Sequence, residues 1–376
     1  MTIQSPRTKG EHERFANFGR EVYRDQSKWV PPDSEHIVAQ LSGCFPGADQ
    51  TQYEAFWVLD TKGRILATVA AVVSESFNRH WKEAIGHLAY FEALPGHDEA
   101  GTAVLRATCD WLRERGCRAA RLSFFPGWQF PLTIDAYDAV PTFLHAMNPP
   151  RYHSIIKNAG FATERSLVEY RIAFTDDLAA EYRRMIDKAG SAGVELRSWN
   201  FARLDQETAR FCEINNECFA RHWGIPQFTV EELSGLTVGL RDFLVADFTG
   251  FAEVGGEIVG YVYATPDLNQ AFHAMKGKDP AADADEFQRR LGKTDHGMLL
   301  IIGVRKPWRG RGINLALAAR SYLAMIDRGY KSASYTLVLD DNWPSRRTAE
   351  KLGGQVARNF VVYRREIDGP AEREKQ

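Results

Sequence analysis

Two stretches of this sequence repeat the same order of apolar runs, turns and helical patterns, and no other feature constrains the fold as strongly. Each stretch opens on two apolar runs joined by a glycine-containing turn of hairpin length. Repetition of this kind indicates a duplicated domain. In the first stretch these elements fall at 56–60, 65–73, 85–93, 99–115, 118–124, just before Gly160 and at 167–174. In the second they fall at 251–254, 258–264, 298–304, 312–328, 332–339, 344–352 and 355–366.

Length and composition agree with two globular domains. The chain has 376 residues, whereas single domains cluster at about 100 to 200 residues. Apolar residues make up 44% and charged residues 26%, so each half can bury a core without disulfides or metal ions. The charged segment 176–193 predicts a helix that ends in small residues, which suits a domain junction. We therefore expect a first domain at 1–175, a helical linker at 176–193 and a second domain at 194–376.

Charge and cysteine content argue against several classes of protein. A formal net charge of -2 disfavours a nucleic-acid carrier, because phosphate binding needs a concentrated excess of basic residues. The five cysteines lack CxxC or metal-ligand spacing and indicate free thiols in a reducing compartment. No run of about 18 apolar residues occurs, and residues 1–15 lack the apolar core of a secretory signal. We expect a cytoplasmic protein with no metal, membrane or nucleic-acid partner, whose oligomeric state the sequence does not indicate.

Two long segments have no counterpart in the repeated order. Residues 126–149 are rich in aromatic residues and Pro, and residues 267–297 carry charges around Pro280. Connections of this length in a compact domain are usually functional covers or disordered segments. The sequence alone leaves both alternatives open.

The most informative segment is 301–315, where an apolar strand runs into a basic glycine turn and then into a helix. The first turn of a helix has unpaired backbone N–H groups and the positive end of the helix dipole, so it attracts anions. Gly310 and Gly312 let the backbone approach a ligand without a Cβ clash. Arg309 and Arg311 add positive charge beside it. The segment therefore predicts a pyrophosphate site.

This arrangement of strand, basic glycine turn and helix resembles the GNAT superfamily of N-acyltransferases. The family motif follows a strand and reads Arg or Gln, two residues, Gly, one residue, then Gly or Ala. Arg309 and Gly312 match this pattern, whereas Asn314 departs from it by placing a polar side chain where the coenzyme usually meets almost none. The resemblance implies that the turn binds the pyrophosphate of coenzyme A.

A second segment, 342–353, resembles the same family at the spacing the family uses. Asn342 and, three positions later, Ser345 correspond to the Asn and the small residue that begin a helix and touch the coenzyme. The two matches together span about 298–365. They imply an α/β (α+β) protein with tandem GNAT-like domains, each a mixed, mostly antiparallel sheet flanked by helices. Residues 23–32 also resemble a segment of bacterial tandem GNAT-like proteins.

The resemblance implies acetyl-CoA or another acyl-CoA as co-substrate and an amine of a small molecule or peptide as acceptor. Backbone N–H groups of residues 302–304 are the expected donors to the oxyanion of the tetrahedral intermediate. The residues implied in binding the coenzyme are Ile302, Gly303, Val304, Arg309, Gly310, Arg311, Gly312, Ile313, Asn314, Asn342 and Ser345.

The catalytic residues are less clearly marked. Many GNAT enzymes protonate the leaving thiolate with a Tyr, and the matching position here is Ala349. A predicted helix near 201–221 carries Glu217, and His222 follows it, on the side that borders the acceptor in this fold, so both are candidates for the base. The alternative is that Glu217 lies on a solvated acidic face and His222 at an interface. Other titratable residues, without a spacing argument, are Tyr261, Tyr263 and Asp340.

The first half has acidic residues in its counterpart of the glycine turn. In residues 94–101, Asp98 and Glu99 stand where the second half has arginines, and they would repel a pyrophosphate. We therefore expect a degenerate GNAT-like domain that does not bind the coenzyme. The leading function is an acyl-CoA-dependent N-acyltransferase. The alternatives are a tRNA-dependent aminoacyl transferase of tandem GNAT fold, which the charge disfavours, and a non-catalytic acyl-CoA sensor or scaffold, which Ala349 favours.

Overall fold

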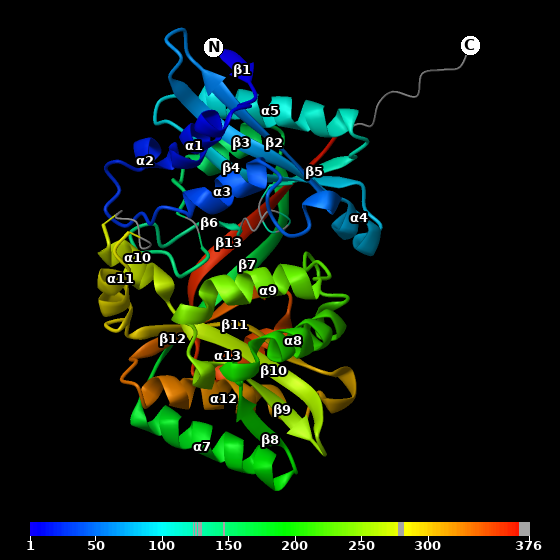
Figure 1. Cartoon of the computed structure of the whole chain (residues 1–376), viewed down its shortest axis with the longest axis vertical. Coiled ribbons are helices and arrows are strands. Elements are labelled where there is room, and N and C mark those ends of the chain that lie inside the picture. Colours follow the sequence, from blue (N-terminus) through cyan, green and yellow to red (C-terminus); the bar gives the residue numbers. More distant parts are fainter. Residues whose placement is uncertain (123, 125, 127–129, 146, 277–281, 368–376) are drawn as a thin grey trace, which may run out of the picture. The chain divides into compact units, whose positions relative to one another are not determined.

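The structure is a computed structural model that describes residues 1–376 except 123, 125, 127–129, 146, 277–281 and 368–376. Contacts divide the chain into two compact units (Figure 1). Each unit contains a mixed, mostly antiparallel sheet flanked by helices, which confirms the predicted fold class. Unit 1 comprises Met1–Pro141, His145–Ser166 and Phe360–Gln376, and unit 2 comprises Thr142–Leu144 and Leu167–Asn359.

The sheet of unit 1 has the strand order β1-β2-β3-β4-β5-β13, with β6 paired to β13. β4 and β5 run parallel, and the other described pairs in this unit are antiparallel. Helix α5 packs on β3 because apolar residues recur along it every three or four positions. The elements are β1 (Thr2–Gln4), α1 (Lys9–Asn17), α2 (Gly19–Val22), α3 (Ser34–Leu41), β2 (Thr51–Leu59), β3 (Ile65–Ser74), α4 (Glu75–Trp81), β4 (Ile85–Ala93), α5 (Asp98–Glu114), β5 (Ala119–Leu122), β6 (Leu132–Thr133), α6 (Tyr152–Asn158) and the end of β13 (Gln355–Glu366).

The sheet of unit 2 has the strand order β7-β12-β11-β10-β9-β8. β11 and β12 run parallel, and the other described pairs in this unit are antiparallel. Its elements are β7 (Ala162–Ala173), α7 (Asp176–Ser191), β8 (Glu195–Ser198), α8 (Leu204–Phe219), α9 (Val230–Leu240), β9 (Gly250–Val254), β10 (Glu257–Pro266), α10 (Leu268–Ala274), α11 (Ala284–Leu291), β11 (His296–Val304), α12 (Ile313–Ile326), β12 (Ser332–Leu339) and α13 (Trp343–Lys351).

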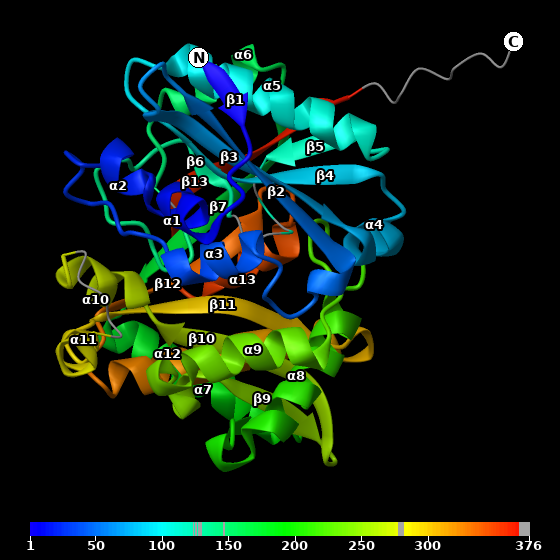
Figure 2. The same cartoon turned by 45° about the horizontal axis from the view of Figure 1, so that its top comes forward.

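Helices cover both faces of the unit 2 sheet. On one face α12 lies directly on the strands and α7 lies beside it (Figure 1), where the Tyr322 ring packs 5.8 Å from that of Tyr182. On the other face α8 packs on β10 and β11, and α9 lies next to α8 (Figure 2). The hydroxyl of Tyr261 on β10 donates to the Asn215 side chain on α8 at 2.7 Å. The two faces are therefore distinct, and α8 and α12 mark them.

Two strands cross from one half of the sequence to the other. β7 closes the first half of the sequence but pairs with β12 in unit 2, and β13 closes the second half but pairs with β5 in unit 1. The segment 176–193 forms α7, whose apolar residues are buried in the core of unit 2 rather than exposed as in a linker. The compact units therefore differ from the expected limits 1–175, 176–193 and 194–376, because strand pairing and helix packing assign segments to units regardless of their order in the chain.

The predicted order of helices and strands is confirmed in both halves. The segment 267–297, which the repeat did not explain, contains α10 and α11, while Pro280 lies outside the described residues. None of the helices that the structure describes has an apolar stretch long enough to span a bilayer. Within the same residues, no group of three or more His, Cys, Asp and Glu side chains is arranged to hold a metal ion.

Candidate acyl-coenzyme A site in unit 2

The parallel strands β11 and β12 separate halfway along their length. They pair from His296 with Ser332 to Leu299 with Tyr335, and no further pairing between them is found in the described residues. Beyond this point β11 continues to pair with β10 and β12 with β7. The separation opens a wedge between two strands of one sheet, which we call the unit 2 splay. An extended ligand can lie in such a wedge and use the free strand edges.

A β-bulge lies where the splay begins. Tyr263 of β10 pairs with Ile301 and Ala264 pairs with Leu299, so Leu300 is the extra residue on β11. A bulge re-aims the backbone N–H and C=O groups next to it, which makes them available to a ligand. The sequence predicts oxyanion donors only at 302–304, and the bulge adds Leu300 to these candidates. A lone apolar residue in an apolar strand offers no sequence signal for a bulge.

The glycine turn leads directly into the first turn of α12. Gly310 and Gly312 both have φ of +79°, a backbone conformation that favours glycine. A Cβ at either position would meet nothing within 4 Å, so conformation rather than crowding requires glycine here. No described side chain caps the start of α12 at Ile313. The N–H groups of this turn therefore remain available to an anion, as the sequence predicts.

The two arginines of the turn lie at the surface but are anchored. The Arg309 guanidinium donates to the carbonyls of Val304 at 2.9 Å and Cys218 at 3.3 Å. Arg311 donates to the carbonyl of Pro307 at 3.4 Å and stacks 4.6 Å from the centroid of the Trp308 ring. A guanidinium has five N–H donors, so both retain donors and charge for a phosphate. Arg309 also braces the turn against the ends of β11 and α8.

The strand residues predicted to contact the coenzyme line the splay unequally. Ile302 is half-buried, whereas Gly303 and Val304 are buried. A Cβ on Gly303 would lie 2.5 Å from the Tyr261 ring and 3.1 Å from Cys218. Glycine at 303 therefore lets α8 approach β11 closely.

The remaining predicted contacts lie between α12 and α13. The Asn342 side chain accepts a hydrogen bond from the N–H of Ser345 at 3.3 Å and so caps α13. The Ser345 hydroxyl contacts that of Tyr335 at 3.0 Å. Asn314, the departure from the family motif, donates to Thr348 on α13 at 2.8 Å. Its polar group is thus bonded within the protein rather than left unpaired beside the ligand.

Glu217 lies in an ion-pair cluster around Arg305. The guanidinium contacts Glu217 at 3.1 Å, Glu213 at 3.1 Å and Glu257 at 2.8 Å. The side chain of Glu217 is 48% exposed. A half-exposed carboxylate engaged by Arg305 at the surface is the arrangement expected of a solvated acidic face, so this geometry favours the surface interpretation of Glu217.

His222 is half-buried and has a different environment. Its ring packs 5.2 Å from that of Phe219, and Nδ1 lies 3.3 Å from the carbonyl of Trp223. Burial lowers the pKa of His222, and the Trp223 carbonyl and the charge of Asp341 offset part of this effect. The imidazole is therefore neutral near pH 7 and can accept a proton. The structure describes no direct contact between His222 and Glu217.

A buried hydrogen-bond chain that the sequence does not predict crosses β11, β12 and β7. Arg171 donates to Ser332 at 3.1 Å, and Ser332 and Ser334 lie 2.8 Å from the two ring nitrogens of His296. Ser334 in turn donates to Glu169. Ser334 gives its one hydroxyl proton to Glu169, so it accepts from Nε2 of the neutral His296 ring, which carries the proton, and Nδ1 accepts from Ser332. Alternating serines within the apolar strand 332–339 are the one sequence signal for it.

Unit 1 has its own splay, but the surroundings differ. β4 and β5 pair from Ile85 with Ala119 to Leu88 with Leu122, the described part of the chain shows no pairing between them beyond this point, and β4 has a bulge between Ala89 and Glu92. The connection from β4 to α5 is four residues, 94–97, whereas that from β11 to α12 is eight, 305–312.

The hydroxyl of Tyr152 on α6 accepts the N–H of Ala93 at 2.8 Å and donates to Glu92 at 2.6 Å. Side chains of α6 thus occupy the free edge of β4.

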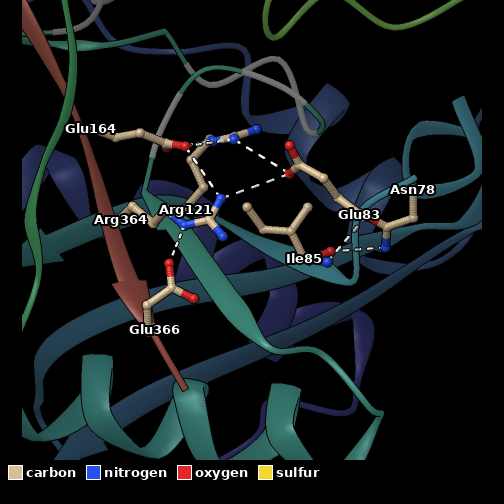
Figure 3. Close-up of polar contacts among 7 residues, drawn as sticks. All are labelled: Asn78, Glu83, Ile85, Arg121, Glu164, Arg364 and Glu366. Atoms are coloured by element: carbon tan, nitrogen blue, oxygen red, sulfur yellow. Dashed lines mark hydrogen bonds and ion pairs between the residues drawn. The ribbon is translucent and has the colours of Figure 1, made fainter. Parts of the chain in front are cut away.

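A charge cluster around the buried Arg121 lies at the opposite end of the unit 1 strands (Figure 3). Arg121 on β5 makes a bidentate pair with Glu164 at 2.7 and 2.8 Å and lies 3.5 Å from Glu83. Arg364 on β13 contacts Glu164 at 3.4 Å and Glu366 at 2.6 Å. Each of the two arginines of this cluster is paired with carboxylates, and the cluster joins β13 to the strands of the first half.

The family model described as Acetyltransferase (GNAT) family matches residues 208–354. This segment contains the unit 2 splay, the glycine turn and helices α12 and α13. It belongs to the GNAT family of acyltransferases, and the chain as a whole has the fold of a tandem GNAT protein.

Solved structures that share this fold extend over the full chain. A tandem GNAT protein from the clavulanic acid biosynthesis pathway is 12% identical with a TM-score of 0.59, over 99% of this chain and 100% of that chain. A GCN5-related N-acetyltransferase from Sphaerobacter thermophilus is 16% identical with a TM-score of 0.53, over 98% of this chain and 96% of that chain. At these identities the likeness extends to the fold alone.

Two relatives match by sequence over nearly their whole length. The bacterial ceramide synthase of Caulobacter vibrioides (strain NA1000 / CB15N) is 24% identical over 380 residues, which is 98% of each chain. Protein YghO of Escherichia coli (strain K12) is 21% identical over 368 residues, 96% of this chain and 94% of that one. The similarity therefore includes the first half of the sequence as well as the GNAT segment.

Proposed function

We propose that the protein is an acyl-CoA-dependent N-acyltransferase whose coenzyme binds in unit 2. The observation that supports this most directly is the unit 2 splay, which ends beside an uncapped helix start preceded by two left-handed glycines. Such a site offers a wedge for an extended thioester arm and backbone N–H groups for the pyrophosphate. The thioester supplies an activated acyl carbonyl with a thiol as leaving group.

The residues of this chain would then act as follows. The N–H groups of the first turn of α12, with Arg309 and Arg311, hold the pyrophosphate. Backbone N–H groups near the bulge at Leu300, or at 302–304, donate to the acyl oxygen as negative charge develops on it. The amine loses one proton to His222, directly or through water, and its nitrogen bonds the acyl carbon as the carbon–sulfur bond breaks. The thiolate leaves without a Tyr, since position 349 is Ala.

The relatives support a more specific acceptor class. Ceramide is the N-acyl amide of a long-chain amino alcohol, and the ceramide synthase of Caulobacter vibrioides matches this chain end to end at 24% identity. We therefore propose a long-chain amino alcohol as the first acceptor to test, with a long-chain acyl-CoA as donor. Acetyl transfer to a small-molecule or peptide amine is the second candidate. It is favoured by the fold neighbour from Sphaerobacter thermophilus, which is a GCN5-related N-acetyltransferase.

Calorimetry followed by an activity assay tests this proposal. We expect coenzyme A and acyl-CoA to bind with a stoichiometry of one per chain, and thiol release to require an added amine. Binding without release by any amine in a panel from peptides to long-chain amino alcohols would favour the sensor or scaffold alternative. Absence of coenzyme binding together with binding of aminoacyl-tRNA would favour the tRNA-dependent alternative.

A further inference from the structure

The two long segments without a counterpart in the repeat, 126–149 and 267–297, contact each other in unit 2. Residues Thr142–Leu144 of the first segment belong to unit 2 although their neighbours on both sides belong to unit 1. We call Thr142–Leu144 the strap. The second segment contributes Asp267 and helix α10. This contact gives both segments a defined place in the fold.

Three hydrogen bonds hold the strap on buried polar groups. The Thr142 hydroxyl donates to Oε1 of Glu169 at 2.6 Å, and the Phe143 N–H donates to Oδ1 of Asp267 at 2.7 Å. The Asn269 side chain donates to the Thr142 carbonyl at 3.2 Å. Glu169 is 4% exposed and Asp267 is 5% exposed. Covering two carboxyl groups in this way is unfavourable unless each receives hydrogen bonds, and the strap supplies one to each.

The strap also has apolar contact and backbone strain. The Phe143 ring lies 6.3 Å from that of Phe272 on α10. Leu144 has φ of +69°, a left-handed conformation that is strained for a non-glycine residue. The contacts of the strap must outweigh this strain, which is relieved if the strap leaves.

The position of the strap bears on the unit 2 splay. Successive residues of a strand point to opposite faces of the sheet. Tyr170 of β7 accepts a hydrogen bond from Arg346 on α13, so the side chain of Glu169 points to the opposite face, which carries α8. Glu169 accepts from Ser334, one residue before the last paired position of β12. The strap therefore lies over the end of the buried hydrogen-bond chain from Arg171, next to the point where the splay begins.

We propose that the strap is a pH-sensitive latch on unit 2, closed on Glu169 and Asp267 in mildly acidic conditions and released as the pH rises above neutrality. Release withdraws the Thr142 hydroxyl and the Phe143 N–H from the two carboxyl groups and exposes Asp267 and Glu169, which lies next to the splay, to solvent. The latch depends only on the described contacts and does not rest on the proposed acyl transfer.

The direction of the pH effect follows from the surroundings of Asp267. Burial and, to a smaller extent, the charge of Glu169 raise the pKa of Asp267 to about 7, although the bonded N–H groups and the charge of Arg171 act to lower it. His296, whose pKa burial lowers to about 4, is neutral in this range. A raised pKa means that the closed state binds more protons than the open one. Closure is therefore favoured at low pH, and this contribution is lost as the pH rises through about 7.

Hydrogen exchange of the whole chain, followed by mass spectrometry on peptides that cover the strap, tests the latch. After correction for the intrinsic rate, protection of the Phe143 amide should fall about tenfold between pH 6 and pH 8. Linkage predicts this factor for one carboxyl group with a pKa of 3.8 when exposed and about 7 when covered. Equal protection at the two pH values would overturn the proposal.

Two variants isolate the titrating group. Asp267→Asn keeps an oxygen acceptor for Phe143 but cannot ionise, so protection should become the same at both pH values; a persistent fall would overturn the proposal. Thr142→Val removes the hydrogen bond to Glu169 and should lower the protection of the Phe143 amide equally at both pH values. If Asp267→Asn fails to fold by circular dichroism, Glu169→Gln serves instead. It should move the midpoint of the transition to lower pH, and an unmoved midpoint would contradict the latch.

Discussion

Unit 1 and unit 2 each contain one pair of parallel strands, β4 with β5 and β11 with β12, but the polar groups around these strands are satisfied differently. In unit 1 the Tyr152 hydroxyl accepts the N–H of Ala93 and Arg151 donates to the Ala93 carbonyl, so helix α6 fills the edge of β4. In unit 2 the polar groups of α13 bond other partners: the Ser345 hydroxyl contacts that of Tyr335, and Thr348 accepts from Asn314. The same scaffold can therefore hold a ligand or satisfy its strand edges with its own side chains.

The connection after the strand differs in the same sense. The turn of unit 2 is eight residues long, contains two left-handed glycines and has no cap in the described structure. That of unit 1 is four residues long, and Asp98 in the first turn of α5 is paired with Arg151 at 2.8 Å. A helix start that already carries a carboxylate has no electrostatic attraction for phosphate. The turn of unit 1 thus differs from that of unit 2 in its length and in its acidic residue, in addition to the filled edge of β4.

The largest effect should come from placing a carboxylate in the turn of unit 2. Gly312→Asp is expected to weaken acyl-CoA binding about a hundredfold, since it repels the pyrophosphate and obstructs the N–H groups that hold it. The matched control is Gly96→Asp in unit 1, which has the same φ of +79° and therefore the same backbone strain. Calorimetry should show unchanged affinity in the control. Equal losses in both variants would mean that strain rather than the site explains the result.

Turnover should depend on His222 in unit 2. His222→Ala is expected to lower it by about two orders of magnitude without changing coenzyme affinity, as for loss of a general base. Because burial lowers the pKa of His222, the rate should fall on the acid side only below pH 6.5, where the imidazole becomes protonated. The pH profile of turnover in an amine assay checks this, and His97→Ala in unit 1 is the control.

Glu217 offers a sharper test of the same site. Glu217 pairs with Arg305 at the surface. On the interpretation that Glu217 lies on a solvated face, Glu217→Gln should change turnover less than threefold. A loss comparable to that of His222→Ala, with intact coenzyme affinity, would instead identify Glu217 as a catalytic residue.

A smaller loss of coenzyme affinity than that of Gly312→Asp is expected from reversing one charge of the turn. Arg309→Glu should weaken coenzyme binding by about tenfold, because a charge-assisted contact becomes a repulsive one, and the loss should shrink at high salt. Arg309 also braces Val304 and Cys218, so Arg311→Glu, which lacks these contacts, separates charge from bracing. Unchanged affinity in both variants would remove the turn from the binding site.

The smallest effect concerns the filled edge of unit 1. Burial raises the pKa of Glu92 to about 7, so the folded state binds this proton more tightly than the unfolded state. Its contribution to the free energy of unfolding is present below pH 4.5 and is lost as the pH rises through about 7. Glu92→Gln should flatten this part of the pH dependence in urea titrations while leaving acyl-CoA affinity unchanged. A change in affinity would mean that unit 1 takes part in binding.

The sequence by itself determined the order of the elements and the position of the glycine turn, because periodicity, turn residues and helix signals act over a few neighbouring residues. The run from 301 to 315 forms strand, turn and helix as predicted, with Gly310 and Gly312 left-handed. Tertiary structure decided what depends on distant partners. Strand edges pair wherever the folded chain brings them together, so β7 and β13 each cross into the other unit's sheet. Arg305 forms an ion pair with Glu217, and Glu169 on β7 accepts hydrogen bonds from Ser334 and from Thr142 of the strap. Charged and buried polar groups need partners wherever the fold places them, and these partners are distant in the sequence.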